Sequence, residues 1–86
     1  QNYPNPFNPE TTINFSLQEA GDMALEIYNI KGQRVTTLVS SNLEAGKHSV
    51  VWNGKDESGR SVVSGIYFYR MRSGKYIETK KMILLK

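Results

Sequence analysis

Short runs in which large apolar residues alternate with polar or small ones constrain this chain more than any other feature. They cover residues 13–17 and 23–27. A period of two places successive side chains on opposite faces of a strand, which is typical of a sheet with one buried face. No segment shows the 3.6-residue period of an amphipathic helix. We therefore expect an all-β protein.

Glycines recur between these runs, as tight turns between short strands require. We expect turns at residues 19–22 and 29–32 and a polar loop at 53–60. Further strands are expected at residues 35–39, 48–52, 66–71 and 76–85, with at most a short strand at 61–63. Turn signals every roughly 8–12 residues predict an antiparallel β-sandwich of about seven strands. Trp52 is predicted to anchor the core between its two sheets.

Length and composition argue against an enzyme. The chain has 86 residues, of which 38% are hydrophobic and 22% charged, and no cysteine. A domain of this size buries only roughly 60–65% of the surface of its unfolded chain, so a deep catalytic cleft would compete with the core. The missing cysteines exclude disulfides and thiolate chemistry. No apolar run approaches the roughly 18 residues of a membrane-spanning helix.

Charge is distributed unevenly along the chain. Residues 1–43 carry two basic and four acidic side chains, whereas residues 44–86 carry nine basic and four acidic ones. Six of the basic residues, against one acidic residue, follow Gly65. Such a segment is either an ordinary solvated strand face or a surface for phosphate or another anionic partner.

All three prolines lie within the first nine residues. Proline fixes φ and restricts the residue before it to extended backbone. We therefore expect residues 1–9 to form a stiff linker or edge segment, with Phe7 packed on the edge of a sandwich formed by residues 10–86. The chain begins at Gln1 without an initiator methionine or signal segment, so we expect it to be a piece of a longer protein.

Five motifs in order carry a family resemblance. They are residues 2–13 (NYPNPFNPETTI), 25–35 (LEIYNIKGQRV), 46–54 (GKHSVVWNG), 64–70 (SGIYFYR) and 80–86 (KKMILLK). Together they resemble the C-terminal sorting domains of the bacterial type IX secretion system. The opening motif contains the linker residues Asn5, Pro6, Phe7, Asn8 and Pro9. The stretch from Gly46 to Met71 is also similar to the immunoglobulin-like module of flagellar hook-capping proteins.

The resemblance implies an immunoglobulin-like sandwich that performs no catalysis and needs no cofactor. It implies a module that directs an N-terminal passenger of the same chain through the periplasm and across the outer membrane, for release or surface attachment. The implied partners are the outer-membrane secretion machinery and a sortase-like protease. The family motifs place recognition on residues Gly65, Tyr67, Gly74, Lys81 and Lys86.

The last predicted strand also has a physical reason to be recognised. Residues 82–85 are all apolar and lie between Lys81 and Lys86. Lysines that flank an apolar strand oppose aggregation through its edge. The same strand is either a plain core strand or one that also pairs with a receptor's sheet through its backbone.

The sequence offers few residues for chemistry. Oxygen-bearing side chains gather in one loop, which makes a weak candidate calcium site of Asn53, Asp56, Glu57 and Ser58. The spacing does not match a twelve-residue calcium loop, and an ordinary hairpin loop is the simpler interpretation. His48 is the only histidine, and its place in an alternating strand predicts a packed or surface residue. No metal ion or cofactor is expected.

Aromatic residues support one further alternative. Exposed Tyr67 and Tyr69 would suit an accessory carbohydrate-binding module of a secreted hydrolase, whereas core packing is the usual role of such pairs. The second alternative is a structural module of the hook-capping type. Arg70 and Arg72 beside Tyr69 are too few to predict nucleic-acid binding.

Overall fold

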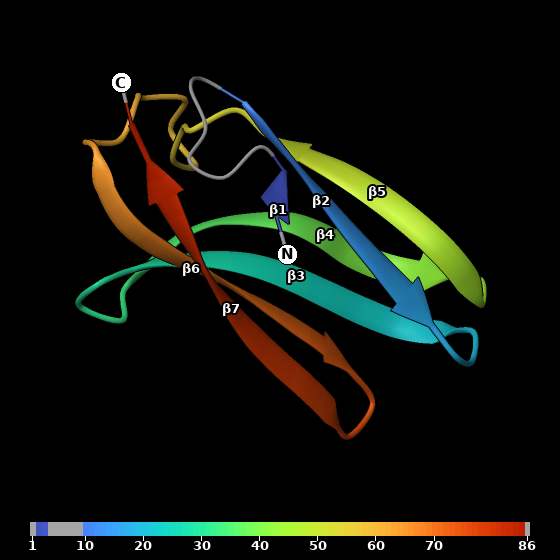
Figure 1. Cartoon of the computed structure of the whole chain (residues 1–86). Coiled ribbons are helices and arrows are strands. Elements are labelled where there is room, and N and C mark those ends of the chain that lie inside the picture. Colours follow the sequence, from blue (N-terminus) through green and yellow to red (C-terminus); the bar gives the residue numbers. More distant parts are fainter. Residues whose placement is uncertain (1, 4–9, 86) are drawn as a thin grey trace.

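In the computed structural model, the chain is a β-sandwich made of antiparallel pairs (Figure 1). The structure describes residues 2–3 and 10–85, with side chains for 10–85. Its strands are β1 (Asn2–Tyr3), β2 (Thr11–Leu17), β3 (Gly21–Asn29), β4 (Arg34–Leu43), β5 (Gly46–Trp52), β6 (Gly65–Ser73) and β7 (Tyr76–Leu84). No helix among the described residues is long and apolar enough to cross a membrane. The predicted all-β sandwich is confirmed.

The strands form two sheets that pack face to face. One has the order β1-β2-β5 and the other the order β4-β3-β6-β7. Strands β2 and β5 pair over their whole length, from Thr11 opposite Trp52 to Leu17 opposite Gly46. In the second sheet, β3 lies between β4 and β6, and the β6–β7 hairpin forms one side of the molecule (Figure 1).

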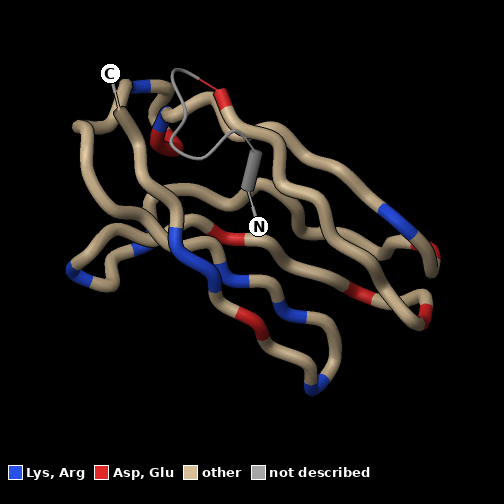
Figure 2. Tube along the Cα trace, in the orientation of Figure 1, with Lys and Arg blue, Asp and Glu red and all other residues tan. Residues whose placement is uncertain are grey.

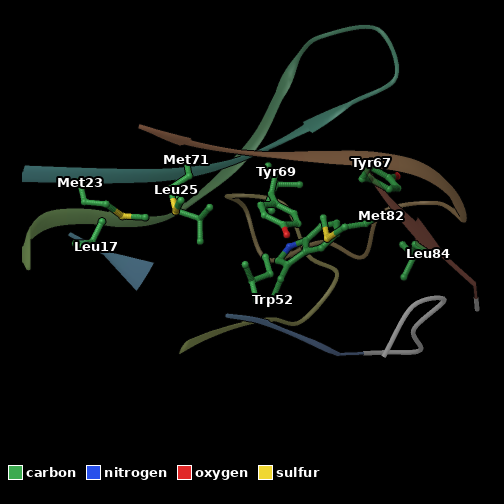
Figure 3. Close-up of a cluster of buried hydrophobic side chains, with 11 residues drawn as sticks. Leu17, Met23, Leu25, Trp52, Tyr67, Tyr69, Met71, Met82 and Leu84 are labelled. Carbon is green, nitrogen blue, oxygen red and sulfur yellow. The ribbon is translucent and has the colours of Figure 1, made fainter. Parts of the chain in front are cut away.

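The core lies between the sheets and follows the alternation seen in the sequence. Every second side chain of β2, β3 and β6 points inward, and methionine, leucine and tyrosine from β6 and β7 complete the layer (Figure 3). Trp52 is 1% exposed, and its ring meets that of Tyr67 edge to face with centroids 5.4 Å apart. Its indole Nε1–H donates to the Lys55 carbonyl at 3.0 Å. The prediction for Trp52 is confirmed.

Two of the turns depend on the side chain or the backbone freedom of particular residues. The Asn29 side-chain Oδ1 accepts hydrogen bonds from the backbone N–H groups of Lys31 and Gln33, both at 3.0 Å, and Gly32 has a φ of 81°. This confirms the turn predicted at residues 29–32. Gly74 has a φ of 61° at the first central position of the two-residue β6–β7 turn, which is the glycine position of a type II′ hairpin.

Some predicted boundaries were wrong. Strand β4 runs over Arg34–Leu43 rather than residues 35–39, because pairing with β3 continues through polar serine and asparagine residues. Register shifts interrupt that pairing between Leu25 and Glu26 and between Ile27 and Tyr28. Residues 61–63, where at most a short strand was expected, contribute an isolated bridge from Ser61 to Lys55. The predicted packing of Phe7 lies outside the described residues.

Candidate recognition surface

Strand β7 lies at the end of the four-stranded sheet. Among the described strands it pairs only with β6, so the backbone along its other side is open. In a two-residue hairpin the residue pair next to the turn, here Ser73–Tyr76, is joined by backbone hydrogen bonds. Hydrogen-bonded and non-hydrogen-bonded pairs then alternate along the two strands. The N–H groups of Ile77, Thr79 and Lys81 therefore face the open edge.

The side chains of β7 divide between the two faces of the sheet. Met82 and Leu84 are fully buried in the core, whereas Ile83 is 36% exposed and Leu85, just after the strand, is 51% exposed. Lys81 is exposed and lies opposite Phe68 of β6. The C-terminal part of the strand is thus apolar on both faces, with a cation beside it.

The recognition residues implied by the resemblance do not gather in one place. Gly65 pairs with Leu84 and Tyr67 with Met82, so these positions lie beside the C-terminal half of β7 near Lys81. Gly74 lies at the opposite end of the hairpin, in its turn. Lys86 and the motif at residues 5–9 lie outside the described residues. A surface that includes both Gly65 and Gly74 would extend along the whole hairpin, and the Tyr67 side chain points into the core.

The carbohydrate platform on Tyr67 and Tyr69 is wrong. These side chains are 4% and 3% exposed because they point into the core, so neither presents a ring to a ligand (Figure 3). The Tyr67 hydroxyl donates to the Val63 carbonyl at 2.7 Å. The Tyr69 hydroxyl is buried with no hydrogen-bond partner among the described residues.

Burial changes the acidity of these phenols. It raises the pKa of Tyr67, and burial together with the nearby Glu78 carboxylate raises the pKa of Tyr69 to about 12. Both hydroxyls therefore keep their protons well into the alkaline range. They are structural groups at neutral pH.

The candidate calcium loop is held together by its own oxygen atoms. Asp56 Oδ1 accepts from the N–H groups of Ser58 and Arg60 at 2.9 and 3.0 Å, and Asp56 Oδ2 lies 3.6 Å from Arg60 Nε. Asn53 Oδ1 accepts from the Lys55 N–H at 3.2 Å, and Glu57 Oε1 lies 3.3 Å from the Arg34 Nε. Among the described residues no three His, Cys, Asp or Glu side chains converge on a metal position. The geometry supports a structural loop.

His48 is half-buried on the core-facing side of the smaller sheet, opposite Phe15. Its ring stacks on Phe15, with centroids 5.4 Å apart and planes 22° apart, and its Nε2 lies 2.7 Å from the Glu44 carbonyl oxygen. The prediction of a packed or surface histidine is confirmed.

One cluster escaped the sequence analysis. Glu26 of β3 is only 7% exposed and lies within ion-pair distance of three arginines on two other strands. Its Oε1 is 3.5 Å from Arg70 Nη2 and 3.4 Å from Arg72 Nη2, and its Oε2 is 3.9 Å from Arg34 Nη1. The alternation in the sequence places Glu26 on a polar face but does not identify its partners. The register of β3 against β6 brings Arg70 and Arg72 to it, and the register against β4 brings Arg34.

Tyr28 joins this cluster from the same strand. Its hydroxyl donates to Glu26 Oε1 at 3.0 Å and accepts from Arg70 Nη2 at 2.6 Å. The guanidinium carbon of Arg70 also lies 4.7 Å from the centre of the Tyr28 ring, a cation–π contact. The four charged groups and the phenol form one network, called here the Glu26 cluster (Glu26, Tyr28, Arg34, Arg70 and Arg72).

The architecture and the spacing of these motifs agree with one known family. The family model described as the FlgD Ig-like domain matches residues 5–76. The chain belongs to this family. The match ends at the first residue of β7, so nearly all of this strand lies beyond it. No curated protein matches the sequence.

Solved structures show where else this FlgD-type fold occurs. FlgD from P. aeruginosa is 22% identical with a TM-score of 0.68, and FlgD from Xanthomonas campestris is 21% identical with a TM-score of 0.69. The alignments cover 86% and 92% of this chain, and the chain spans 57% and 58% of those two proteins.

Two proteins of Porphyromonas gingivalis share the fold over a greater part of this chain. PorU, described as dimeric and latent, is 21% identical with a TM-score of 0.78, and the match covers 99% of this chain. PorZ, described as an essential surface component of the type IX secretion system, is 19% identical with a TM-score of 0.71 over 100% of it. This chain spans only 9% and 11% of those proteins, and at these identities the likeness shows the fold alone.

Proposed function

We propose that this FlgD-type immunoglobulin-like domain is a non-catalytic sorting module of a larger exported protein. In this proposal the outer-membrane secretion machinery recognises strand β7, and the passenger is released or attached at the cell surface. A sortase-like protease is the second proposed partner, and the route runs through the periplasm.

The observation that carries the proposal is the open edge of β7. A strand with unpaired backbone groups on one side can add to the sheet of another protein, and its exposed side chains supply specificity. On β7 these include Lys81 and Ile83, and Leu85 follows directly after the strand, so apolar and cationic contacts adjoin the edge. The motifs of the type IX sorting family and the coverage of the whole chain by PorU and PorZ add support.

A fusion experiment tests the proposal. Residues 1–86 are joined to an inert periplasmic protein and produced in a bacterium that has the type IX machinery. The proposal predicts that the passenger reaches the cell surface or the medium, and that a strain without the machinery keeps it in the periplasm. Retention of a folded fusion in the competent strain contradicts the proposal.

A second candidate is a structural module of the hook-capping kind, which the family match over residues 5–76 favours. The Xanthomonas campestris FlgD is described in connection with hook capping essential for flagellar assembly. Replacing the immunoglobulin-like domain of a FlgD with residues 10–85 tests this candidate. Restored hook assembly supports it, whereas a stable chimera that assembles no hook contradicts it.

A further inference from the structure

The outer face of the four-stranded sheet carries an excess of guanidinium groups. Three arginines surround the single carboxylate of Glu26, and Figure 2 shows basic residues gathered along β6 and β7. Glu57 pairs with Arg34 at 3.3 Å. Asp22, also on this face, accepts a hydrogen bond from Asn42 and forms no ion pair in the described part of the chain. The cluster therefore keeps unbalanced positive charge.

These guanidinium groups are held in place yet remain accessible. The side chains of Arg34, Arg70 and Arg72 are 52%, 39% and 47% exposed. Glu26 contacts all three from below, and Tyr28 fixes Arg70 by a hydrogen bond and a ring contact. Because these positions are set before any partner arrives, binding loses less side-chain entropy than it would with free lysines.

The spacing of two of these arginines suits an extended ligand. Arg70 and Arg72 are two residues apart on β6, so their Cα atoms lie about 6.5–7 Å apart on the same face. Carboxylates at alternate positions of an extended peptide have the same separation. A guanidinium group can bind a carboxylate through two parallel hydrogen bonds, which makes this match specific.

The same face becomes apolar toward the other end of β6. Ile66 lies opposite Ile83, both 36% exposed, and the half-buried Phe68 lies opposite Lys81. Arginine, aromatic and aliphatic side chains together are the composition of protein-binding surfaces, from which lysine is usually depleted. A ligand along β6 would therefore meet aliphatic groups at one end and guanidinium groups at the other.

We propose that this face binds an extended protein segment that has apolar residues followed by acidic residues at alternate positions. A second copy of the domain does not fit by the same face, because the two clusters would place like charges opposite each other. The inference does not depend on the sorting role, since it uses the outer face of the sheet rather than the open edge of β7.

A peptide titration followed by amide NMR spectra of the 86-residue chain tests the inference. The probe is a seven-residue synthetic peptide, with leucine at its first and third positions, glutamate at its fifth and seventh, and serine between. The same peptide in reverse order covers the other chain direction. We expect shifts in β3, β6 and β7 for one of the two, and at least tenfold weaker binding when glutamine replaces both glutamates.

Protein variants locate the site. Arg72→Gln is expected to weaken binding about tenfold, as is Arg70→Gln, which serves if the first variant unfolds. Lys47→Gln, an exposed cation on β5, should leave binding unchanged. Equal losses in Lys47→Gln and Arg72→Gln would show general charge attraction and overturn the inference. Equal binding of the glutamine peptide would also overturn the inference. The same holds if the domain binds phosphatidylglycerol vesicles but neither glutamate peptide.

Discussion

Glu26 shows how much of this domain depends on a single charged residue. A buried carboxylate is costly unless cations and donors surround it, and here three guanidinium groups and one phenol do so. In return, the carboxylate offsets the repulsion between the positive charges of Arg70 and Arg72. The Glu26 cluster is therefore a structural element of the sheet as well as part of its outer surface.

Replacing Glu26 with glutamine should destabilise the domain by about 2–3 kcal/mol, because three guanidinium groups lose their shared counter-charge while water still reaches them. Urea unfolding measures the change. The loss should shrink in high salt, which screens the repulsion among the arginines. Asp22→Asn, on the exposed part of the same strand, is the control and should change stability by less than about 0.5 kcal/mol. A Glu26→Gln domain as stable as the parent would contradict this account.

The two core tyrosines form a natural matched pair. Tyr67 donates to the Val63 carbonyl at 2.7 Å, whereas the Tyr69 hydroxyl has no hydrogen-bond partner among the described residues. Tyr67→Phe should therefore cost about 1 kcal/mol, and Tyr69→Phe should be neutral or slightly stabilising at pH 7. Thermal unfolding compares them. Equal losses would show that the two hydroxyls contribute alike.

Tyr69 should also make stability depend on alkaline pH. Its pKa is about 12 in the folded chain against 10.0 ordinarily, so between these values the folded state holds a proton that the unfolded state has released. The contribution is complete below pH 10 and is lost as the pH rises toward 12. Urea unfolding from pH 9 to 12 should show a decline that Tyr69→Phe reduces. An unchanged decline in the variant would contradict the assignment.

At the scale of elements, the hairpin between β6 and β7 depends on Gly74. Its φ of 61° lies in the region that side chains disfavour, although no atom lies within 4 Å of an added Cβ. Gly74→Ala should cost about 1–2 kcal/mol through backbone strain alone. Gly21→Ala is the control, since that site is equally open and has no positive φ. Equal stabilities of the two variants in urea unfolding would contradict the strain argument.

Strands β2 and β6 were predictable because large apolar residues alternate along them and these are the residues whose side chains face the core. The full length of β4 was not, because Ser40, Ser41 and Asn42 continue the ladder without an apolar pattern. The open edge of β7 also follows from the sheet order, which no local pattern encodes. The Glu26 cluster was missed for the same reason, since it joins residues that only strand register brings together.

At the scale of the whole molecule, the two sheets leave different surfaces for different partners. The open edge of β7 offers backbone groups, and the outer face beside it offers the Glu26 cluster. In the proposed sorting role the export machinery reads the first surface, whereas the hook-capping candidate rests on a family match over residues 5–76 that ends before nearly all of β7. A change confined to the edge N–H groups of β7 therefore separates the two candidate functions.

Thr79 provides that change, because its N–H faces the open edge and its side chain is exposed. Proline at this position removes the edge N–H but no hydrogen bond to β6, so the domain should still fold. Thr79→Ala, which keeps the N–H, is the matched control.

The decisive measurement is the fraction of an inert passenger that reaches the medium or cell surface when fused to each variant in a bacterium with type IX machinery. The account predicts export with the parent and Thr79→Ala domains and periplasmic retention with a folded Thr79→Pro domain. Equal export of all three fusions would contradict recognition through the β7 edge.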